Sequence, residues 1–167
     1  MAFLYSILYL ALLGLLCFPV GRLLARYTFR ADRLPFRSLS FENDGRLYIK
    51  IGIRKWQNRL PDVSKLFPNV VPEKKLKEGL SATGLHRMVQ ETCVAEVTHV
   101  LLCIAGAALL WLWPGAGGVI FFVFYILIGN VPFILIQRYN RPRLQRLLLA
   151  AQQRERKIHE GSGPQQQ

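Results

Sequence analysis

The residues Val97 to Gln137, VTHVLLCIAGAALLWLWPGAGGVIFFVFYILIGNVPFILIQ, decide the fold. Two apolar runs, Val97–Trp113 and Val119–Gln137, are each long enough for a helix to cross the hydrocarbon core of a bilayer. Between them stands Pro114-Gly-Ala-Gly-Gly118, a cluster of helix breakers that is typical of a tight turn. This stretch therefore predicts a transmembrane helical hairpin.

A third apolar run, Ala2 to Val20, carries no charge and predicts a further span near the start of the chain. A cleaved signal peptide is the alternative, but no Lys or Arg precedes the apolar core, and no clear small-x-small cleavage site follows it. We therefore expect an all-α integral membrane protein with three transmembrane helices, a cytoplasmic loop with an amphipathic helix, and a helical C-terminal tail. The expected order is a first span at 2–20, a cytoplasmic loop at 22–84, a long helix at 85–113 that contains the second span, an external turn at 114–118, a third span at 119–137, a basic cytoplasmic tail at 138–160 and a disordered end at 161–167.

The distribution of positive charge predicts the orientation. All 22 Lys and Arg residues lie either between Arg22 and Arg87 or between Arg138 and Lys157. With three spans these two regions share one side of the membrane, and the positive-inside rule makes that side cytoplasmic. We expect a multi-pass protein of the cell membrane with its N-terminus outside. The net charge of +12 then reflects topology and attraction to anionic lipid rather than binding of nucleic acid.

The loop contains one stretch with helical periodicity. The apolar residues Ile49, Ile53, Trp56 and Leu60 recur at spacings of four, three and four, which predicts an amphipathic helix on the membrane surface with Trp56 at head-group level. Alternating apolar residues over 47–53 also fit a strand, but a single strand without partners is unstable.

Further local signals mark a turn and two helices. Asn43-Asp-Gly45 is a turn signal. The residues Ser81-Ala-Thr-Gly84 predict the cap of a helix that starts near Leu85 and runs without a breaker through Trp113. The tail after Arg143 is expected to be helical until about Ile158.

A stripe of polar side chains lies where that long helix enters its apolar part. Thr92, Glu96, His99 and Cys103 follow at steps of four, three and four on one narrow face, with Glu91 on its flank. A hydrogen bond from an imidazole N–H of His99 to the carboxylate of Glu96 would produce a general base. The alternative is that Glu96 and His99 are merely solvated at the membrane boundary. The cost of placing ionisable groups there favours a functional site.

The sequence offers no complete metal or acyltransferase motif. Cys17, Cys93 and Cys103 lack the spacing of zinc ligands, and Glu-x-x-His occurs once where a di-iron bundle needs it twice. We expect no metal and no cofactor. His86 and Glu91 have the His-x4-acid spacing of glycerolipid acyltransferases, but on a continuous helix the two side chains diverge by about 140°.

The third span ends in a polar segment. Asn130 interrupts the apolar run, and Pro132 removes a backbone donor and predicts a kink there. Asn130 then serves either substrate or the backbone freed by the kink. Three arginines and two amides follow at the cytoplasmic exit, and together they are suited to clamp a phosphate or another anion; ordinary flanking charge explains only the arginines. These residues are Gln137, Arg138, Asn140, Arg141 and Arg143.

Three motifs carry a resemblance to a known family. They are Phe41-Glu-x-x-Gly45 followed by Arg54-Lys-Trp56, then Glu91-Thr-x-x-Ala-Glu-x-x-His99, and Asn130-Val-Pro-x-Ile-x-x-Gln-Arg-Tyr-Asn-Arg-Pro-Arg-Leu144. In these motifs the chain resembles the glycosyl-4,4'-diaponeurosporenoate acyltransferases of bacterial carotenoid biosynthesis. The resemblance covers residues 41–144 except 62–85.

Members of that family are small bacterial membrane proteins that transfer a fatty acyl chain to the C6 hydroxyl of a glucose on a carotenoid acid. The resemblance therefore implies O-acyl transfer, with acyl-CoA or acyl carrier protein as donor and a membrane glycolipid as acceptor, within the lipid bilayer. The rival hypothesis is a non-catalytic membrane adaptor or an anionic-lipid-binding protein. Three thin spans enclose little volume, which is compatible with a homodimer.

The resemblance brings no established catalytic residues, so the site is inferred from the residues at motif positions. His99, oriented by Glu96, would take the proton of the sugar hydroxyl as it attacks the thioester carbonyl. The arginines would bind the donor, and Gln137, Asn140 or Asn130 would donate to the oxyanion. The candidate substrate-binding residues are Glu91, Thr92, Asn130, Gln137, Arg138, Asn140, Arg141, Arg143, Lys55 and Trp56.

Overall fold

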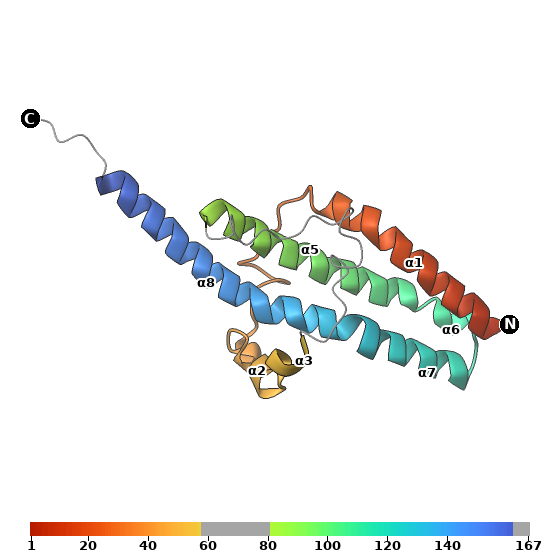
Figure 1. Cartoon of the computed structure of the whole chain (residues 1–167). Coiled ribbons are helices and arrows are strands. Elements are labelled where there is room, and N and C mark those ends of the chain that lie inside the picture. Colours follow the sequence, from red (N-terminus) through yellow and green to blue (C-terminus); the bar gives the residue numbers. More distant parts are fainter. Residues whose placement is uncertain (58–80, 162–167) are drawn as a thin grey trace, which may run out of the picture. The chain divides into compact units, whose positions relative to one another are not determined.

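The structure, a computed structural model, describes residues 1–57 and 81–161, and these residues form helices and turns without a strand. This confirms the all-α prediction and excludes the strand alternative for 47–53. In chain order the elements are α1 (Ala2–Leu24), η1 (Ser40–Glu42), α2 (Arg46–Lys50), α3 (Ile53–Trp56), α5 (Ala82–Gly106), α6 (Leu109–Leu112), α7 (Ala116–Phe124), the π-helix η3 (Tyr125–Asn130) and α8 (Val131–Gly161). Figure 1 labels the α-helices.

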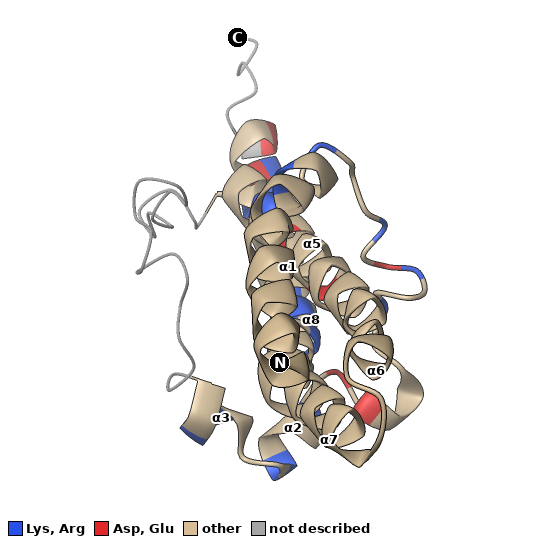
Figure 2. Cartoon of the chain, turned by 90° about the vertical axis from the view of Figure 1, so that its right-hand side faces the viewer, with Lys and Arg blue, Asp and Glu red and all other residues tan. Residues whose placement is uncertain are grey.

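Three helical stretches are long and apolar enough to cross a membrane, as the sequence predicts. They are Ala2–Leu24, Ala82–Leu112 and Ala116–Glu160. Large apolar side chains on these helices are exposed, such as Leu15 at 65% and Ile104 at 66%. Their exposure would promote aggregation in water, whereas in a bilayer these side chains contact lipid favourably. Neither α6 nor α7 carries a charged residue (Figure 2).

The chain divides into two compact units. The first unit comprises Met1–Arg37 and Gln90–Arg138, and the second comprises Ser38–Val89 and Tyr139–Gln167. The helices α5 and α8 each contribute residues to both units.

In the first unit the expected tight turn joins α6 to α7. Gly115 has φ 96°, a left-handed conformation that only glycine adopts readily. A side chain at Gly118 would overlap the carbonyl group of Trp113. The ring of Phe3, at the start of α1, lies 5.7 Å from the ring of Trp113 and 5.6 Å from that of Phe121. Glycine thus lets the turn close, and aromatic rings from α1 and the hairpin pack around it.

The second span differs from the expected unbroken helix over 85–113. The helix α5 ends at Gly106, two residues form a turn, and α6 follows. A Cβ at Gly106 would overlap the ring of Tyr125, whose hydroxyl donates to the carbonyl oxygen of Leu102 at 3.3 Å. The hydroxyl of Tyr9 donates to the carbonyl oxygen of Ala105 at 2.7 Å. Side chains from α1 and η3 therefore satisfy carbonyl groups near the break.

The helix α5 begins at Ala82, three residues before the expected start. The backbone N–H of Gly84 donates to Oγ of Ser81 at 3.1 Å, which confirms the predicted cap. The backbone N–H of Ala82 also donates to Oε1 of Glu155, at 2.9 Å, within the second unit.

The second unit contains the predicted turn before α2. Asn43, Asp44 and Gly45 have φ values of 47°, 52° and 88°, so three consecutive residues are left-handed. Asn and Asp tolerate this conformation better than other side chains, and Gly tolerates it without cost. The turn signal in the sequence is confirmed.

The predicted amphipathic helix over 49–60 is instead divided into α2 and α3. Gly52, with φ 73°, separates the two short helices. Ile53 is fully buried while Ile49 is 41% exposed, so the apolar residues do not share one face. Leu60, the last residue of the predicted stripe, lies outside the described residues.

The kink predicted at Pro132 takes the form of a wide helical turn. The π-helix η3 ends at Asn130, immediately before α8, because Pro132 has no N–H with which to continue the regular ladder. The helix α8 then continues through Pro142 to Gly161, beyond the expected end near Ile158. The predicted disordered segment 161–167 falls, after Gly161, outside the described residues.

Candidate active site

His99 on α5 and Asn130 at the end of η3 form the central contact of the first unit. Nδ1 of His99 lies 3.0 Å from Oδ1 of Asn130. The amide of Asn130 is almost completely buried, and its Nδ2 donates to the carbonyl oxygen of Tyr125 at 3.2 Å. Because a carbonyl oxygen can only accept, this second bond orients the amide and directs Oδ1 towards the imidazole.

The orientation of Asn130 selects the tautomer of His99. Since Oδ1 can only accept, Nδ1 of His99 must carry a hydrogen, and in the neutral ring Nε2 then has the lone pair. The ring of Phe133 stacks on the imidazole with centroids 4.8 Å apart and an interplanar angle of 5°. A fixed tautomer and a fixed ring plane are what a general base requires.

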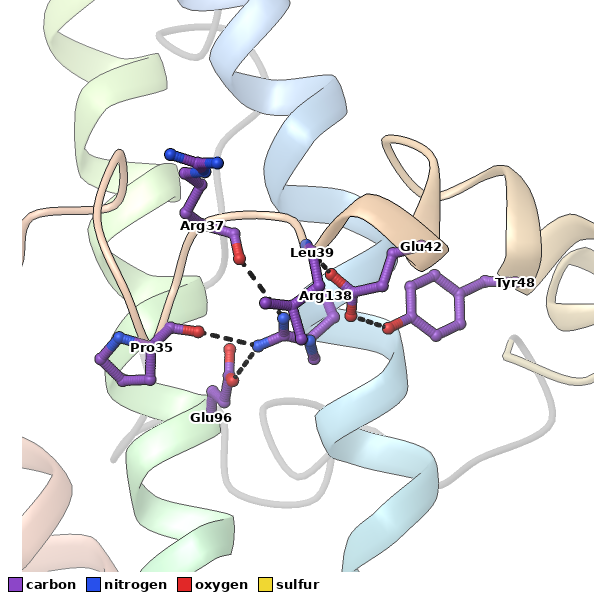
Figure 3. A network of polar contacts seen from close by, with 7 residues as sticks. All are labelled: Pro35, Arg37, Leu39, Glu42, Tyr48, Glu96 and Arg138. Carbon is purple, nitrogen blue, oxygen red and sulfur yellow. Dashed lines mark hydrogen bonds and ion pairs between the residues drawn. The ribbon is translucent and has the colours of Figure 1, made fainter.

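Glu96 and Arg138 form a second, buried contact in the same unit. Nη1 of Arg138 lies 2.7 Å from Oε1 of Glu96, and the two side chains are only 13% and 8% exposed. Arg138 also donates to the carbonyl oxygens of Pro35 at 3.0 Å and Arg37 at 3.4 Å (Figure 3). One guanidinium thus ties α8 to α5 and to the segment that follows α1.

This arrangement differs from the expected dyad of Glu96 and His99. His99 donates its Nδ1 hydrogen to Oδ1 of Asn130, and Glu96 has Arg138 as an ion-pair partner. The spacing within α5 places the two side chains on one face, as predicted, but each is held by a residue of the neighbouring chain segment. The structure thus places Asn130 beside the imidazole of His99 and Arg138 beside the carboxylate of Glu96.

Other residues of the α5 stripe are also largely buried. Thr92 is 5% exposed and Glu91 is half-buried. Gln90, which sequence reasoning missed, exchanges two hydrogen bonds with the backbone of Phe29, at 2.7 Å and 3.0 Å. Its position next to Glu91 in the second motif is the one signal in the sequence that points to it.

In the second unit the predicted group of arginines is divided. The side chain of Arg141 is 1% exposed, whereas Arg143 is exposed and its guanidinium carbon lies 4.9 Å above the centre of the Tyr139 ring. The Tyr139 hydroxyl accepts a hydrogen bond from Nε of Arg54 at 3.1 Å. Arg138, in the first unit, is bound to Glu96.

Glu42 in the second unit is a buried carboxylate that the sequence analysis did not select. It is 2% exposed and accepts hydrogen bonds from the backbone N–H of Leu39, at 2.6 Å, and from the hydroxyl of Tyr48 (Figure 3). Its presence in the Phe41-Glu-x-x-Gly45 motif is the signal that pointed to it.

The remaining predicted residues lie nearer the surface. Gln137 and Asn140 are half-buried, and Lys55 is exposed. Trp56 is half-buried, and its Nε1 donates to the carbonyl oxygen of Ile51 at 3.3 Å. Within residues 1–57 and 81–161, no group of three His, Cys, Asp or Glu side chains is arranged to hold a metal ion.

Helices apolar enough to cross a bilayer, together with a histidine held as a single tautomer, define a small integral membrane protein with a polar site. The chain belongs to the glycosyl-4,4'-diaponeurosporenoate acyltransferase family, whose model matches residues 32–150, and it is an acyltransferase. Two proteins with that name, from Staphylococcus aureus strains MRSA252 and bovine RF122 / ET3-1, are 33% and 32% identical to it over 132 residues, which is 72% of each chain. No solved structure matches the chain.

Proposed function

We propose that this protein transfers a fatty acyl chain from an acyl thioester to a sugar hydroxyl of a membrane glycolipid, with a glycosyl carotenoid as the acceptor. The names of the relatives support the glycosyl acceptor and the acyl group. The observation that carries the proposal is the hydrogen bond between Nδ1 of His99 and Oδ1 of Asn130, because it leaves Nε2 as the basic nitrogen.

In this proposal His99 is the general base. Nε2 takes the proton from the attacking sugar hydroxyl as the hydroxyl oxygen bonds to the thioester carbonyl carbon. The carbon–sulfur bond then breaks, and the departing thiolate takes the proton back from Nε2. The products are an ester and a free thiol, and no covalent intermediate with the protein is needed. Within the described residues Nε2 makes no hydrogen bond, so it is available to an incoming hydroxyl.

Other residues have supporting roles in the proposal. Asn130 and Phe133 hold the imidazole, and Glu96 with Arg138 holds α5 and α8 together beside it. Gln137 and Asn140, which are half-buried on α8, remain candidates for donors to the oxyanion. Glu91, Thr92, Lys55 and Trp56 remain candidates for substrate contact. In the proposed orientation the loop and the tail lie in the cytoplasm, and the N-terminus lies outside. Acyl thioesters are made in the cytoplasm, so the donor would reach the loop and the tail.

The proposal is tested by an assay of acyl transfer. The full chain in nanodiscs is given a long-chain acyl-CoA and a glycosyl carotenoid, and the ester is measured by mass spectrometry. His99→Ala should lower the rate about 10²- to 10⁴-fold, since that is what a general base contributes. The matched control is His86→Ala, which removes an exposed histidine from the same helix and should leave the rate unchanged. Equal rates for wild type and His99→Ala would exclude His99 as the base.

A further inference from the structure

We infer that a groove in the second unit is a phosphate-binding site, and that its ligand is the nucleotide part of a coenzyme A thioester donor. This inference rests on the proposed acyl transfer, since it assigns the donor of that reaction. The groove has a volume of about 480 Å³, within the range of small-molecule sites. The residues that carry the argument are Asp44, Arg46, Arg54, Tyr139, Arg143 and Arg146.

The charge of the groove selects an anion with several charges. Four guanidinium groups line it against the single carboxylate of Asp44. The four arginines come from α2, α3 and α8, which are far apart in the sequence, so their convergence is a property of the fold. Within the described residues, none of the four has an ion-pair partner, in contrast to Arg138 of the first unit. Unpaired guanidinium groups that line one concave surface are suited to phosphate oxygens.

Tyr139 positions two of these arginines. Its hydroxyl accepts from Nε of Arg54 at 3.1 Å, which leaves both terminal nitrogens of that guanidinium able to donate. Its ring lies 4.9 Å below the guanidinium carbon of Arg143, which orients that group without using any of its N–H donors. Nε of Arg146 likewise donates to a carbonyl oxygen, that of Pro142 at 3.3 Å. The guanidinium groups of Arg54, Arg143 and Arg146 are therefore held in place, and among residues 1–57 and 81–161 their terminal nitrogens have no partner that would prevent them from binding a ligand.

Gly45 shapes the wall of the groove against Tyr139. A Cβ added at Gly45 would lie 3.3 Å from the backbone oxygen of Tyr139, and the φ of Gly45 is 88°. A larger residue there would push α2 away from α8, and Arg46 on α2 would move with it. The glycine of the Phe41-Glu-x-x-Gly45 motif and the tyrosine of the Asn130–Leu144 motif thus meet at this groove.

The class of ligand follows from the number of donors. Coenzyme A carries a diphosphate and a ribose phosphate, whereas a phospholipid head group or a phosphopantetheine arm carries a single phosphate diester. Four guanidinium groups exceed what one phosphate diester needs, because one fork-shaped group suffices for two of its oxygens. The groove therefore matches the nucleotide part of coenzyme A better than the alternatives.

The test is a binding titration with the full chain in nanodiscs of zwitterionic phosphatidylcholine. The ligands are coenzyme A and, as a phosphate-free probe, pantetheine. The double variant Arg54→Ala/Arg146→Ala should raise the Kd for coenzyme A about 100-fold, since each lost charge-assisted contact is worth roughly a factor of ten. The control Arg154→Ala/Lys157→Ala removes the same charge from an exposed part of α8 outside the groove and should change Kd less than about threefold.

A conservative variant guards against misfolding. Tyr139→Phe keeps the ring below Arg143 but removes the acceptor of Arg54, and should weaken coenzyme A binding about threefold to tenfold. An equal loss of binding in the double variant and in the control would overturn the inference, as would pantetheine binding as tightly as coenzyme A. Binding of phosphatidylglycerol nanodiscs through the same arginines, without binding of coenzyme A, would assign the groove to a lipid head group instead.

The two proposals fail in different ways. If coenzyme A binding depends on Arg54 and Arg146 but no ester forms, the acyl transfer proposal is wrong and the phosphate site stands. If ester forms and the double variant keeps the wild-type KM for acyl-CoA, the groove inference is wrong and the acyl transfer proposal stands.

Discussion

The ion pair between Glu96 and Arg138 provides the sharpest test of the structure. The two charges are 2.7 Å apart, and their side chains are 8% and 13% exposed. Removal of one partner from a buried pair costs about 3–5 kcal/mol, because the other charge stays in a poorly solvated place. Since both side chains keep some exposure, we expect the lower end, about 3 kcal/mol, for Glu96→Gln and also for Arg138→Met.

The second contacts of Arg138 add little to this value. The carbonyl oxygens of Pro35 and Arg37, which accept hydrogen bonds from Arg138, belong to exposed residues, so water can replace the guanidinium there. The double variant of Glu96 and Arg138 removes both charges together. It should therefore be less destabilised than the sum of the two single variants, with a coupling energy of about 2 kcal/mol or more.

The assay is a double-mutant cycle on the free energy of unfolding, measured by tryptophan fluorescence as detergent micelles are titrated with SDS. The matched control is the pair of Arg156 and Glu160, which has a similar distance of 2.6 Å but side chains that are 81% and 61% exposed. That pair should give a coupling energy of about 0.5 kcal/mol. If the two cycles give equal coupling energies, the buried ion pair that joins α5 to α8 does not exist as described.

Three further predictions concern single residues. Gly106→Ala should destabilise the protein by about 1–3 kcal/mol, because the new methyl group overlaps the ring of Tyr125, whereas Gly14→Ala, with open space around it, should not lower Tm. Gly45→Ala should cost about 1–2 kcal/mol because its φ is 88°, and an unchanged Tm would contradict the left-handed turn. Asn130→Ala should lower kcat about tenfold or more with little change in KM, because His99, the proposed general base, would no longer be held as one tautomer; a change confined to KM would place Asn130 at the substrate instead.

The helical spans were predictable because lipid imposes a simple rule on sequence. A backbone in hydrocarbon must satisfy its own hydrogen bonds, so long apolar runs such as Ala2–Val20 can only be helices. The loop was less predictable. The apolar spacing from Ile49 to Trp56 predicted one helix because it took no account of Gly52. The left-handed φ of Gly52 separates this stretch into two short helices.

The sequence selected the residues of the candidate site, but it did not predict which of them are in contact. His99, Glu96 and Asn130 were selected because polar groups are costly near lipid, and Arg138 was selected as one of several arginines suited to bind an anion. Spacing within one helix favours local pairs, so it suggested Glu96 as the partner of His99. The actual partner of Glu96, Arg138, lies 42 residues further along the chain, and only tertiary packing reveals it.

The number of residues in the π-helix Tyr125–Asn130 affects which side chains face the site. A wide turn accommodates one residue more than a regular helical path of the same length, so the side chains of α7 and α8 belong to different helical phases. Deletion of one residue, such as Gly129, would allow a regular ladder over this segment, and the residues of the wide turn would take new positions relative to α7 and α8. The carboxamide of Asn130 would then turn away from His99 even though every side chain of the site was still present. In this helix an insertion or a deletion is therefore a more severe change than most substitutions, and the length of the segment is as much a part of the site as its chemistry.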